Sequence, residues 1–168
     1  MTERIVIDSP IGPLTVEADE ETVTYIGLPD DAAPAGPAAA GIGSDALPAP
    51  LAAAVTQLKE YFAGQRDRFD LPLRLAGTAF QRQVWWALGD IPYGETITYA
   101  QLARMVGRPR AFRAVGQANG ANPVPIVLPC HRVVASGGGL GGYGGGVPMK
   151  RRLLDLERAS GLSSRAAG

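Results

Sequence analysis

The only cysteine and the only histidine of this chain stand side by side, as Cys130 and His131. A deprotonated thiol is a strong nucleophile, and an imidazole is the side chain best suited to take up a proton near neutral pH. The pair therefore predicts a nucleophilic site. The alternative is structural, because a buried cysteine is often an inert, small apolar side chain.

The residues before the pair determine where the thiol emerges. The apolar run Ile126–Leu128 predicts a buried strand, and Pro129 keeps the chain extended up to Cys130. Consecutive side chains of an extended chain point in opposite directions. His131 should therefore reach the thiol only through a water molecule or a local turn.

A carboxylate that orients the imidazole is expected on the last helix. The pattern predicts a helix from Pro148 to Gly161, with Glu157 at the edge of its apolar face and Asp155 facing outward. A carboxylate at the edge of a core needs a partner. Glu157 is thus the candidate partner of His131, and a pairing with a nearby arginine is the alternative.

Ten residues between the pair and this helix, 137–146, are mostly glycine. Gly139–Gly144 matches G-x-G-x-x-G, but no βαβ unit and no later acidic residue accompany it, which excludes a dinucleotide fingerprint. Backbone amides of such a loop can instead wrap a planar ligand while Tyr143 covers one side. The alternative is a flexible tether.

The charge of the chain is divided unevenly, although its formal net charge is zero. Residues 1–77 hold 5 Lys and Arg against 12 Asp and Glu, a balance of −7, and residues 78–168 hold 11 against 4, a balance of +7. A basic C-terminal half suggests a polyanionic partner, most commonly nucleic acid. The alternative is a pair of domains that neutralise each other.

Cysteine count and hydropathy exclude several classes of protein. One cysteine excludes an internal disulfide and makes a thiolate zinc site within one chain implausible. The first residues show no signal-peptide pattern, and no apolar run approaches the roughly 20 residues that span a bilayer. We expect a cytoplasmic protein with no membrane partner.

The N-terminal part predicts a small sheet and one helix. Residues 29–50, rich in Ala, Pro and Gly without a period, predict a mobile loop, and a helix should then run from Leu51 to Gly64. Its apolar face should hold Leu51, Val55, Leu58 and Phe62. Strands are expected at residues 4–7, 14–18, 23–28 and 68–73.

The C-terminal part predicts short helices. Capping boxes, each a threonine followed three residues later by glutamine, start two of them at Thr78 and Thr98. The second should end at Val106, and a third should run from Pro109 to Ala118 after a glycine-containing turn. Two short helices joined in this way are typical of a helix-turn-helix, although many such hairpins bind nothing.

The outer face of the third helix favours nucleic acid. At 100° per residue, Arg110, Arg113, Ala114 and Gln117 share one side, whereas Phe112 falls on the opposite, inward side. The outer side is cationic and carries small residues between its arginines. Such a surface allows close approach to a polyanion.

The chain resembles the O6-alkylguanine-DNA alkyltransferases, also called methylated-DNA–protein-cysteine methyltransferases. The resemblance extends from about Phe80 to Glu157, and the opening strands and helix are similar to the family's N-terminal domain. The segments that carry it are Arg113-Ala114-Val115-Gly116 and Asn122-Pro123-Val124-Pro125-Ile126-Val127-Leu128-Pro129-Cys130-His131-Arg132-Val133.

This resemblance implies an α/β (α+β) fold in two domains. Residues 1–76 would form a small sheet-plus-helix domain of RNase H-like type. Residues 77–168 would form a mostly helical domain with the helix-turn-helix and an active-site loop.

The resemblance also implies direct-reversal repair of double-stranded DNA. The alkyl group of O6-alkylguanine would pass stoichiometrically and irreversibly to Cys130, after the base is flipped out from the minor groove. No cofactor and no metal would be needed, and each molecule would react once. We expect a monomer; clustering on DNA and activity on O4-alkylthymine stay open.

Single residues receive roles from the same resemblance. His131, oriented by Glu157, would act as base through a water molecule, Tyr99 would donate to the departing guanine, and Asn122 would be a hinge. The implied base pocket consists of Val133, Tyr143, Gly144 and Gly145. The implied DNA contacts are Arg108, Arg110, Arg113, Ala114, Gln117 and Ser136, with Arg113 filling the space that the base leaves.

Two residues depart from the family pattern. Phe112 stands where the family commonly has a small residue, and its inward position predicts repacking rather than loss of DNA binding. Gly144 replaces a serine found in some members, which removes a side-chain contact. Attack by a thiolate further predicts that the pocket depresses the pKa of the Cys130 thiol.

Two other functions are open at this point. An alkyltransferase-like lesion sensor would bind alkylated DNA without transfer, but such proteins lack the acceptor cysteine that Cys130 supplies. A thiol hydrolase would use Cys130 and His131 as a dyad, which adjacent positions fit badly. It would also leave the basic helix-turn-helix unexplained.

Overall fold

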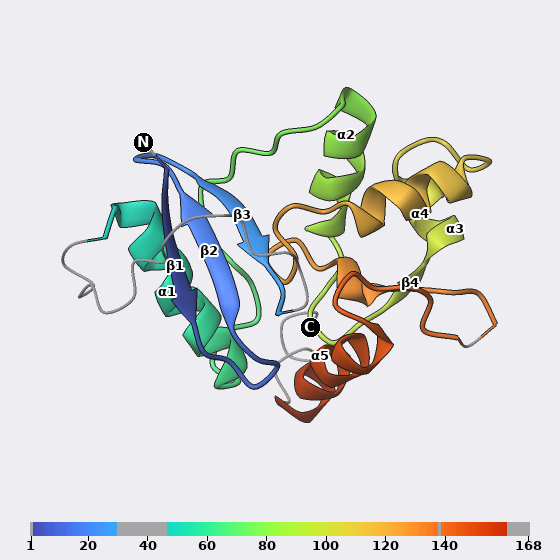
Figure 1. The fold of residues 1–168 in the computed structure, drawn as a ribbon. Coiled ribbons are helices and arrows are strands. Elements are labelled where there is room, and N and C mark those ends of the chain that lie inside the picture. The colour runs from blue at the N-terminus through green and yellow to red at the C-terminus, as the bar shows by residue number, and fades with distance from the viewer. Residues whose placement is uncertain (1, 30–46, 138, 161–168) are drawn as a thin grey trace.

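The structure is a computed structural model that describes residues 2–29, 47–137 and 139–160 (Figure 1). A small sheet and one helix form one side of the molecule, and the remaining helices gather on the other side. The elements in chain order are β1 Glu3–Ile7, β2 Leu14–Ala18, β3 Val23–Gly27, α1 Ala49–Phe62, α2 Ala79–Leu88, β4 Ile97–Thr98, α3 Tyr99–Met105, α4 Phe112–Gly120, β5 Val133–Val134 and α5 Val147–Ser160.

The sheet is antiparallel, with strand order β1-β2-β3. Side chains of β2 alternate, so that Leu14, Val16 and Ala18 are fully buried, as a half-buried strand requires. Helix α1 covers this face of the sheet (Figure 1). Its buried side chains are Leu51, Ala54, Leu58 and Tyr61, whereas the predicted Val55 and Phe62 are only half-buried.

Two predictions for the N-terminal part are wrong. Residues 68–73 form no strand but only a single bridge between Leu73 and Val23. Pro72 has no N–H to donate to a ladder, although its carbonyl accepts from the Val23 amide at 2.8 Å. The predicted loop 29–50 ends too late because α1 begins at Ala49, and its residues 30–46 lie outside the described residues.

Both predicted capping boxes are confirmed. Thr78 Oγ1 accepts from the Gln81 amide at 3.0 Å, and the Gln81 side chain accepts in return from the Thr78 amide at 2.9 Å. Thr98 and Gln101 repeat the arrangement at the start of α3. These bonds satisfy amides that a helix start leaves without partners.

Helix α4 begins later than the pattern indicates. The amide of Ala111 bonds to the Arg108 carbonyl, so residues 108–111 form a turn, and the helix starts at Phe112 instead of Pro109. Arg110 therefore lies in this turn rather than on the helix. Phe112 is 51% exposed, which contradicts its predicted inward position, because α4 starts late and leaves Phe112 as its first residue, at the outer end of the helix.

The predicted strand Ile126–Leu128 is a turn. Ile126 has φ 75°, and the Leu128 amide bonds back to the Val124 carbonyl at 3.0 Å. Asn122 holds this turn closed, since its Nδ2 donates to the Leu128 carbonyl at 2.7 Å and its Oδ1 accepts from the Val124 amide at 3.0 Å. The chain consequently enters the cysteine segment from a tight bend.

Two parts of the C-terminal region are joined by a short parallel ladder. Ile97 pairs with Val133 and Thr98 with Val134. This pairing sets the start of α3, and with it Tyr99, beside the segment that follows His131. A two-residue pairing between segments 35 residues apart carries no sequence pattern, and the sequence did not predict it.

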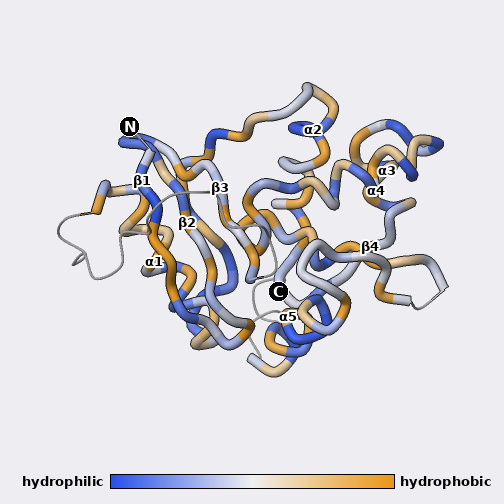
Figure 2. The backbone as a smooth tube through the Cα atoms, viewed as in Figure 1, coloured by the Kyte–Doolittle hydropathy of each residue, from blue (hydrophilic) through white to orange (hydrophobic). Residues whose placement is uncertain are grey.

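Helix α5 closes the molecule beside the cysteine segment. It mixes hydrophilic and hydrophobic residues along its length (Figure 2). Its buried face contains Met149, Lys150, Leu153, Leu154 and Glu157, so two charged residues point inward. No helix among the described residues is long and apolar enough to cross a membrane.

Candidate active site

Cys130 opens a 3₁₀ turn, Cys130–Arg132, and its side chain is buried, with 6% exposed. It lies at a small cavity of about 60 Å³ between the end of α4 and the glycine-rich loop. Asn119 of α4 donates to the Cys130 carbonyl at 3.4 Å. The other residues that line the cavity are Leu28, Gly120, Asn122, Pro125, Gly142, Tyr143 and Gly144.

Burial raises the pKa of the Cys130 thiol to about 11. The Asn122 side chain, the charge of Lys150 and two backbone amides oppose this shift but do not outweigh it. The expectation of a depressed pKa is therefore wrong for the protein without a ligand. The reason is desolvation, which disfavours the charged form of a buried thiol.

This pKa predicts how Cys130 responds to pH. We expect the rate at which iodoacetamide modifies Cys130 in the folded protein to rise about tenfold per pH unit from pH 7 to 10, as the thiolate fraction does. Intact mass gives the rate, and circular dichroism at each pH verifies the fold. A rate that levels off below pH 9 would show that the thiol ionises more easily than this burial allows.

Glu157 is the centre of a buried hydrogen-bond network. Its Oε2 accepts from Tyr61 Oη and His131 Nε2, both at 2.6 Å, and from Arg132 Nη2 at 3.0 Å. Its Oε1 accepts from Arg132 Nε at 2.9 Å and from the Gly94 amide at 3.0 Å. The carboxylate is fully buried, so all its acceptor capacity is satisfied within the protein. Glu157 therefore has both of its predicted partners at once, the histidine and a nearby arginine.

The network defines the protonation of His131. Burial lowers the pKa of His131, although the hydrogen bond to Glu157 opposes the shift. Burial raises the pKa of Glu157, but the hydrogen bonds and charges of His131 and Arg132 outweigh it and hold that pKa well below its usual range. A neutral imidazole beside a carboxylate carries its proton on Nε2.

The second ring nitrogen of His131 is then a base. Nδ1 is buried and accepts no hydrogen bond from any described residue. Because Cys130 and His131 share a 3₁₀ turn, their side chains do not project to opposite sides as in an extended chain. A local turn is present, but it forms no hydrogen bond between Nδ1 and the Cys130 thiol, and Nδ1 is the ring atom left to take a proton.

Tyr61 is a residue of the site that the sequence reasoning missed. It is fully buried on α1, and its hydroxyl bonds to a carboxylate 96 residues later in the chain. Burial, together with the charge of Glu157, raises the pKa of Tyr61, which keeps the hydroxyl a donor. The spacing of Tyr61 with the buried residues of α1 could have placed it in the core, but no local signal names its partner.

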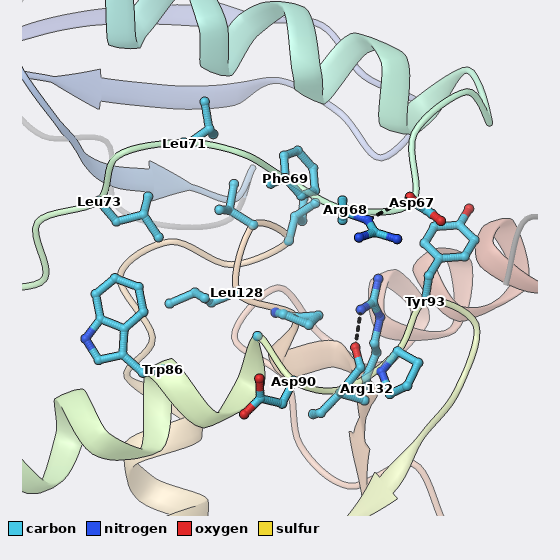
Figure 3. A pocket seen from close by; sticks show the side chains of 16 residues that line it. Asp67, Arg68, Phe69, Leu71, Leu73, Trp86, Asp90, Tyr93, Leu128 and Arg132 are labelled. Atoms are coloured by element: carbon cyan, nitrogen blue, oxygen red, sulfur yellow. Dashed lines mark hydrogen bonds and ion pairs between the residues drawn. The ribbon is translucent and has the colours of Figure 1, made fainter. Parts of the chain in front are cut away.

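Arg132 was also missed, although it follows His131 directly. Its Nη1 donates to the Ile91 carbonyl at 2.7 Å, and its guanidinium lies 5.4 Å from the ring centre of Tyr93. Figure 3 shows Arg132 in a second cavity, of about 470 Å³, between the segment that holds Asp67 to Leu73 and the segment that follows α2. Arg132 thus connects the carboxylate network to the contact between the two halves of the chain.

Lys150 is a third residue that the sequence reasoning missed. Its ammonium donates to the carbonyls of Val133 at 2.5 Å and Gly142 at 3.1 Å, and lies 5.9 Å from the Tyr99 ring centre. Burial lowers the pKa of Lys150 to about 8, and the nearby Cys130 opposes this. Lys150 stands seven residues before Glu157, on the same face of α5, which was the available signal.

The implied base pocket is only partly assembled. Tyr143 and Gly144 line the cavity at Cys130, and a side chain at Gly144 would meet open space. Val133 is buried with its carbonyl bonded to Lys150, and Gly145 packs so tightly that a side chain there would overlap Met149. A cavity of about 60 Å³ is far below the roughly 300 Å³ of the smallest typical ligand pockets. A base can enter only if this loop moves.

The glycine at 141 is required by Tyr99. A side chain there would lie 2.7 Å from the Tyr99 hydroxyl, and φ is +76°. Burial raises the pKa of Tyr99, although a backbone hydrogen bond at Gly142 opposes the shift, so Tyr99 stays protonated. Tyr99 therefore points toward the glycine-rich loop as a hydroxyl donor.

The implied DNA-contacting residues are all exposed. Arg108 lies with its guanidinium 5.4 Å from the Phe80 ring centre, and no acidic residue occurs between Arg104 and Asn122. Helix α4 turns Val115, Ala118 and Asn119 inward. The exposed set consists of Arg108, Arg110, Arg113, Ala114, Gln117 and Ser136.

Within the part of the chain that the structure describes, no group of three or more His, Cys, Asp or Glu side chains is arranged to hold a metal ion.

Comparison with known proteins places the whole arrangement in one family. Residues 4–75 match "6-O-methylguanine DNA methyltransferase, ribonuclease-like domain", and residues 79–159 match "6-O-methylguanine DNA methyltransferase, DNA binding domain". The methylated-DNA–protein-cysteine methyltransferase of Mycolicibacterium paratuberculosis is 48% identical over 158 residues, which cover 94% of this chain and 93% of that protein.

A second relative and a solved structure support the same family. The methyltransferase of the same name from Methanosarcina acetivorans is 41% identical over 90% of this chain and 96% of that protein. The crystal structure of Mycobacterium tuberculosis OGT in complex with DNA superimposes with a TM-score of 0.82 at 43% identity and covers 94% of both chains. The chain therefore belongs to the 6-O-methylguanine DNA methyltransferase family, with an α/β fold built from a ribonuclease-like and a DNA-binding part.

Proposed function

We propose that this protein repairs double-stranded DNA by moving the alkyl group of O6-alkylguanine to Cys130. The observation that carries the proposal is a buried thiol next to a neutral imidazole whose Nε2 is bonded to Glu157 and whose Nδ1 is free to accept a proton. The exposed cationic helix-turn-helix beside it supplies the DNA surface. The names of the relatives, all methylated-DNA–protein-cysteine methyltransferases, support the same reaction.

The reaction needs no group beyond the chain's own side chains. His131 takes the thiol proton through a water molecule as Cys130 Sγ attacks the alkyl carbon, so a sulfur–carbon bond forms and the bond from carbon to guanine O6 breaks. The departing guanine accepts a proton in turn, and we assign the hydroxyl of Tyr99 as its donor. Atoms and charge then balance, and a stable thioether leaves the protein unable to react again.

Proton transfer to His131 explains why the Cys130 thiol need not be ionised before the alkylated guanine binds. With a pKa of about 11, Cys130 is a thiol at neutral pH and reacts only slowly with passing electrophiles. Proton transfer to His131 during attack supplies the nucleophile only when an alkyl carbon is in place. The imidazolium that forms is stabilised by the Glu157 carboxylate.

DNA would be held by the exposed residues of the helix-turn-helix. We assign phosphate and minor-groove contacts to Arg108, Arg110, Ala114, Gln117 and Ser136, and Arg113 to the space that the flipped base leaves. Asn122, which closes the turn before the cysteine, would couple α4 to the base pocket, whose walls we assign to Val133, Tyr143, Gly144 and Gly145. Loop movement would admit the base.

The organisation of the protein forms part of the proposal. Residues 1–76 and 77–168 would be its two domains, and one monomer would react with one lesion. A cytoplasmic location agrees with a mechanism that depends on one reduced thiol.

A mass measurement tests the function. Intact protein is incubated with excess duplex DNA that carries O6-methylguanine, and with the same duplex that carries guanine as control. We expect one added methyl group per chain, mapped to Cys130 and reached without turnover. Tight binding without any mass change would identify a lesion sensor, and continued turnover would identify a hydrolase.

A further inference from the structure

Phe112 is a large apolar side chain on the otherwise small and cationic surface of α4. It is 51% exposed at the first residue of the helix, and the exposed Arg110 and Arg113 flank it. Ala114 and Gly116 are the other positions where the helix can approach a ligand closely. A single exposed aromatic side chain is common on protein surfaces, so its exposure alone carries no function.

The position of Phe112 on α4 adds a second observation. Residues at spacings of four, seven and eight lie on one face of a helix, so Phe112 shares its face with Gly116, Asn119 and Gly120. Asn119 and Gly120 line the cavity at Cys130, and a methyl group at Gly116 would touch the Tyr99 ring at 3.6 Å. Phe112 therefore stands at the outer end of the face that leads to the reacting thiol.

The neighbour of Phe112 in the chain limits where it can meet the duplex. Phe112 directly precedes Arg113, which is assigned to the space that the flipped base leaves. Adjacent residues of a helix are separated by about 1.5 Å along its axis, whereas base pairs follow one another at about 3.4 Å. A nucleotide extruded toward Cys130 would thus leave Phe112 against the paired bases directly beside it.

The surroundings of Phe112 fit the minor groove of DNA. Arg110 on one side can pair with a phosphate, Arg113 on the other is assigned to the vacated base space, and no acidic residue lies nearby in the helix-turn-helix. Proteins that bind this groove often insert an apolar side chain between base pairs, which unstacks and bends the duplex. Phenylalanine is one of the side chains used in this way.

We propose that Phe112 is an apolar wedge that enters the minor groove next to the flipped guanine, beside Arg113, and unstacks the adjacent base-pair step. The bend lowers the cost of extruding the nucleotide toward Cys130. Phe112 is in this sense a positioning residue, since it touches the duplex and not the reacting atoms. The inference rests on the proposed function and adds a residue to it.

Three variants test the wedge. In Phe112→Ala the wedge is absent, in Phe112→Leu an apolar side chain of similar reach stays, and Val6→Ala truncates a 40% exposed residue of the sheet as control. We expect Phe112→Ala to bind an O6-methylguanine duplex about tenfold more weakly and to react correspondingly more slowly, because stacking against bases contributes at this level. The other two variants should stay within about threefold of the parent protein.

Two further readouts separate a wedge from a general loss of binding. 2-Aminopurine, placed in turn one to three base pairs from the lesion on each side, should brighten with the parent protein at one position and not with Phe112→Ala. The slope of log affinity against log salt should be unchanged in Phe112→Ala and smaller by about 0.9 in Arg110→Ala, which removes a charge assigned to a phosphate contact.

The outcomes distinguish this inference from the proposed function. If the parent protein transfers the methyl group but Phe112→Ala binds and unstacks the duplex equally well, the wedge is refuted and the function stands. If Phe112→Ala binds more tightly, Phe112 obstructs the groove and the wedge is equally refuted. If the parent protein neither binds nor accepts the methyl group, the proposed function itself fails.

Discussion

Replacing Cys130 with serine should abolish alkyl transfer, with a loss of at least about 10⁴-fold in rate. A serine hydroxyl ionises far less readily than a thiol, and burial at this position already raises the pKa of Cys130 to about 11. His131 would have to remove a proton from a much weaker acid. Serine is nearly the same size, so the fold and the DNA surface should stay intact.

Mass spectrometry and a binding assay check this prediction together. Cys130→Ser should gain no methyl group from excess O6-methylguanine duplex, and its affinity for that duplex should stay within about threefold of the parent protein. Cys130→Ala, which has no nucleophilic atom at this position, is the matched control for the serine hydroxyl. A methyl group found at any position other than 130 in the serine variant would mean that Cys130 is not the acceptor.

Glu157→Gln should be the most destabilising single change at the site. The carboxylate accepts five hydrogen bonds from Tyr61, Gly94, His131 and Arg132. An amide presents N–H groups to some of these donors and leaves the buried guanidinium of Arg132 without its counter-charge. Breaking a buried pair in this way costs about 3–5 kcal/mol of unfolding free energy.

The same change should slow alkyl transfer by about 10²-fold in the protein that remains folded. Without the carboxylate, the imidazolium that forms during attack is no longer stabilised, and the proton of the neutral ring is no longer held on Nε2. Urea unfolding and single-turnover rates measure the two effects. Asp155→Asn, an exposed carboxylate on the same helix, is the matched control.

The pH dependence of stability gives an independent check of Glu157→Gln. The folded pKa of Glu157 is depressed, so its contribution is present above the ordinary pKa of 4.5 and is lost as pH falls below it. The folded pKa of His131 is also depressed, so stability falls as pH drops below its ordinary value of 6.5. In Glu157→Gln, the loss of stability that Glu157 causes below pH 4.5 should be absent. Equal urea midpoints for this variant and the parent at pH 7 would contradict the network.

Local features were predictable because their partners lie within a few residues. Each capping box joins residues three positions apart, and the alternating burial of β2 follows from the period of a strand. The pairing of Glu157 with the imidazole could also be expected, since a carboxylate at the edge of a core needs a partner. The adjacent cysteine and histidine identified the candidate site directly.

Predictions failed where a tertiary contact or a side-chain bond overrides a pattern. The apolar run Ile126–Leu128 reads as a strand, but the Asn122 side chain holds it as a turn. Phe112 falls on the inward side of an ideal helix, yet the late start of α4 leaves it in solvent. Neither effect has a periodic signature in the sequence.

The sequence by itself determined which residues can do chemistry here, the helix starts and the cationic surface, because each depends on residue type and on neighbours a few positions away. Only the tertiary structure decided the protonation of those residues. The thiol pKa is raised by burial, and the neutral imidazole depends on a carboxylate that Tyr61 of the N-terminal half also holds. Desolvation and hydrogen bonds between distant segments exist only in the folded chain. They keep the Cys130 thiol protonated and leave the neighbouring imidazole neutral and able to accept a proton.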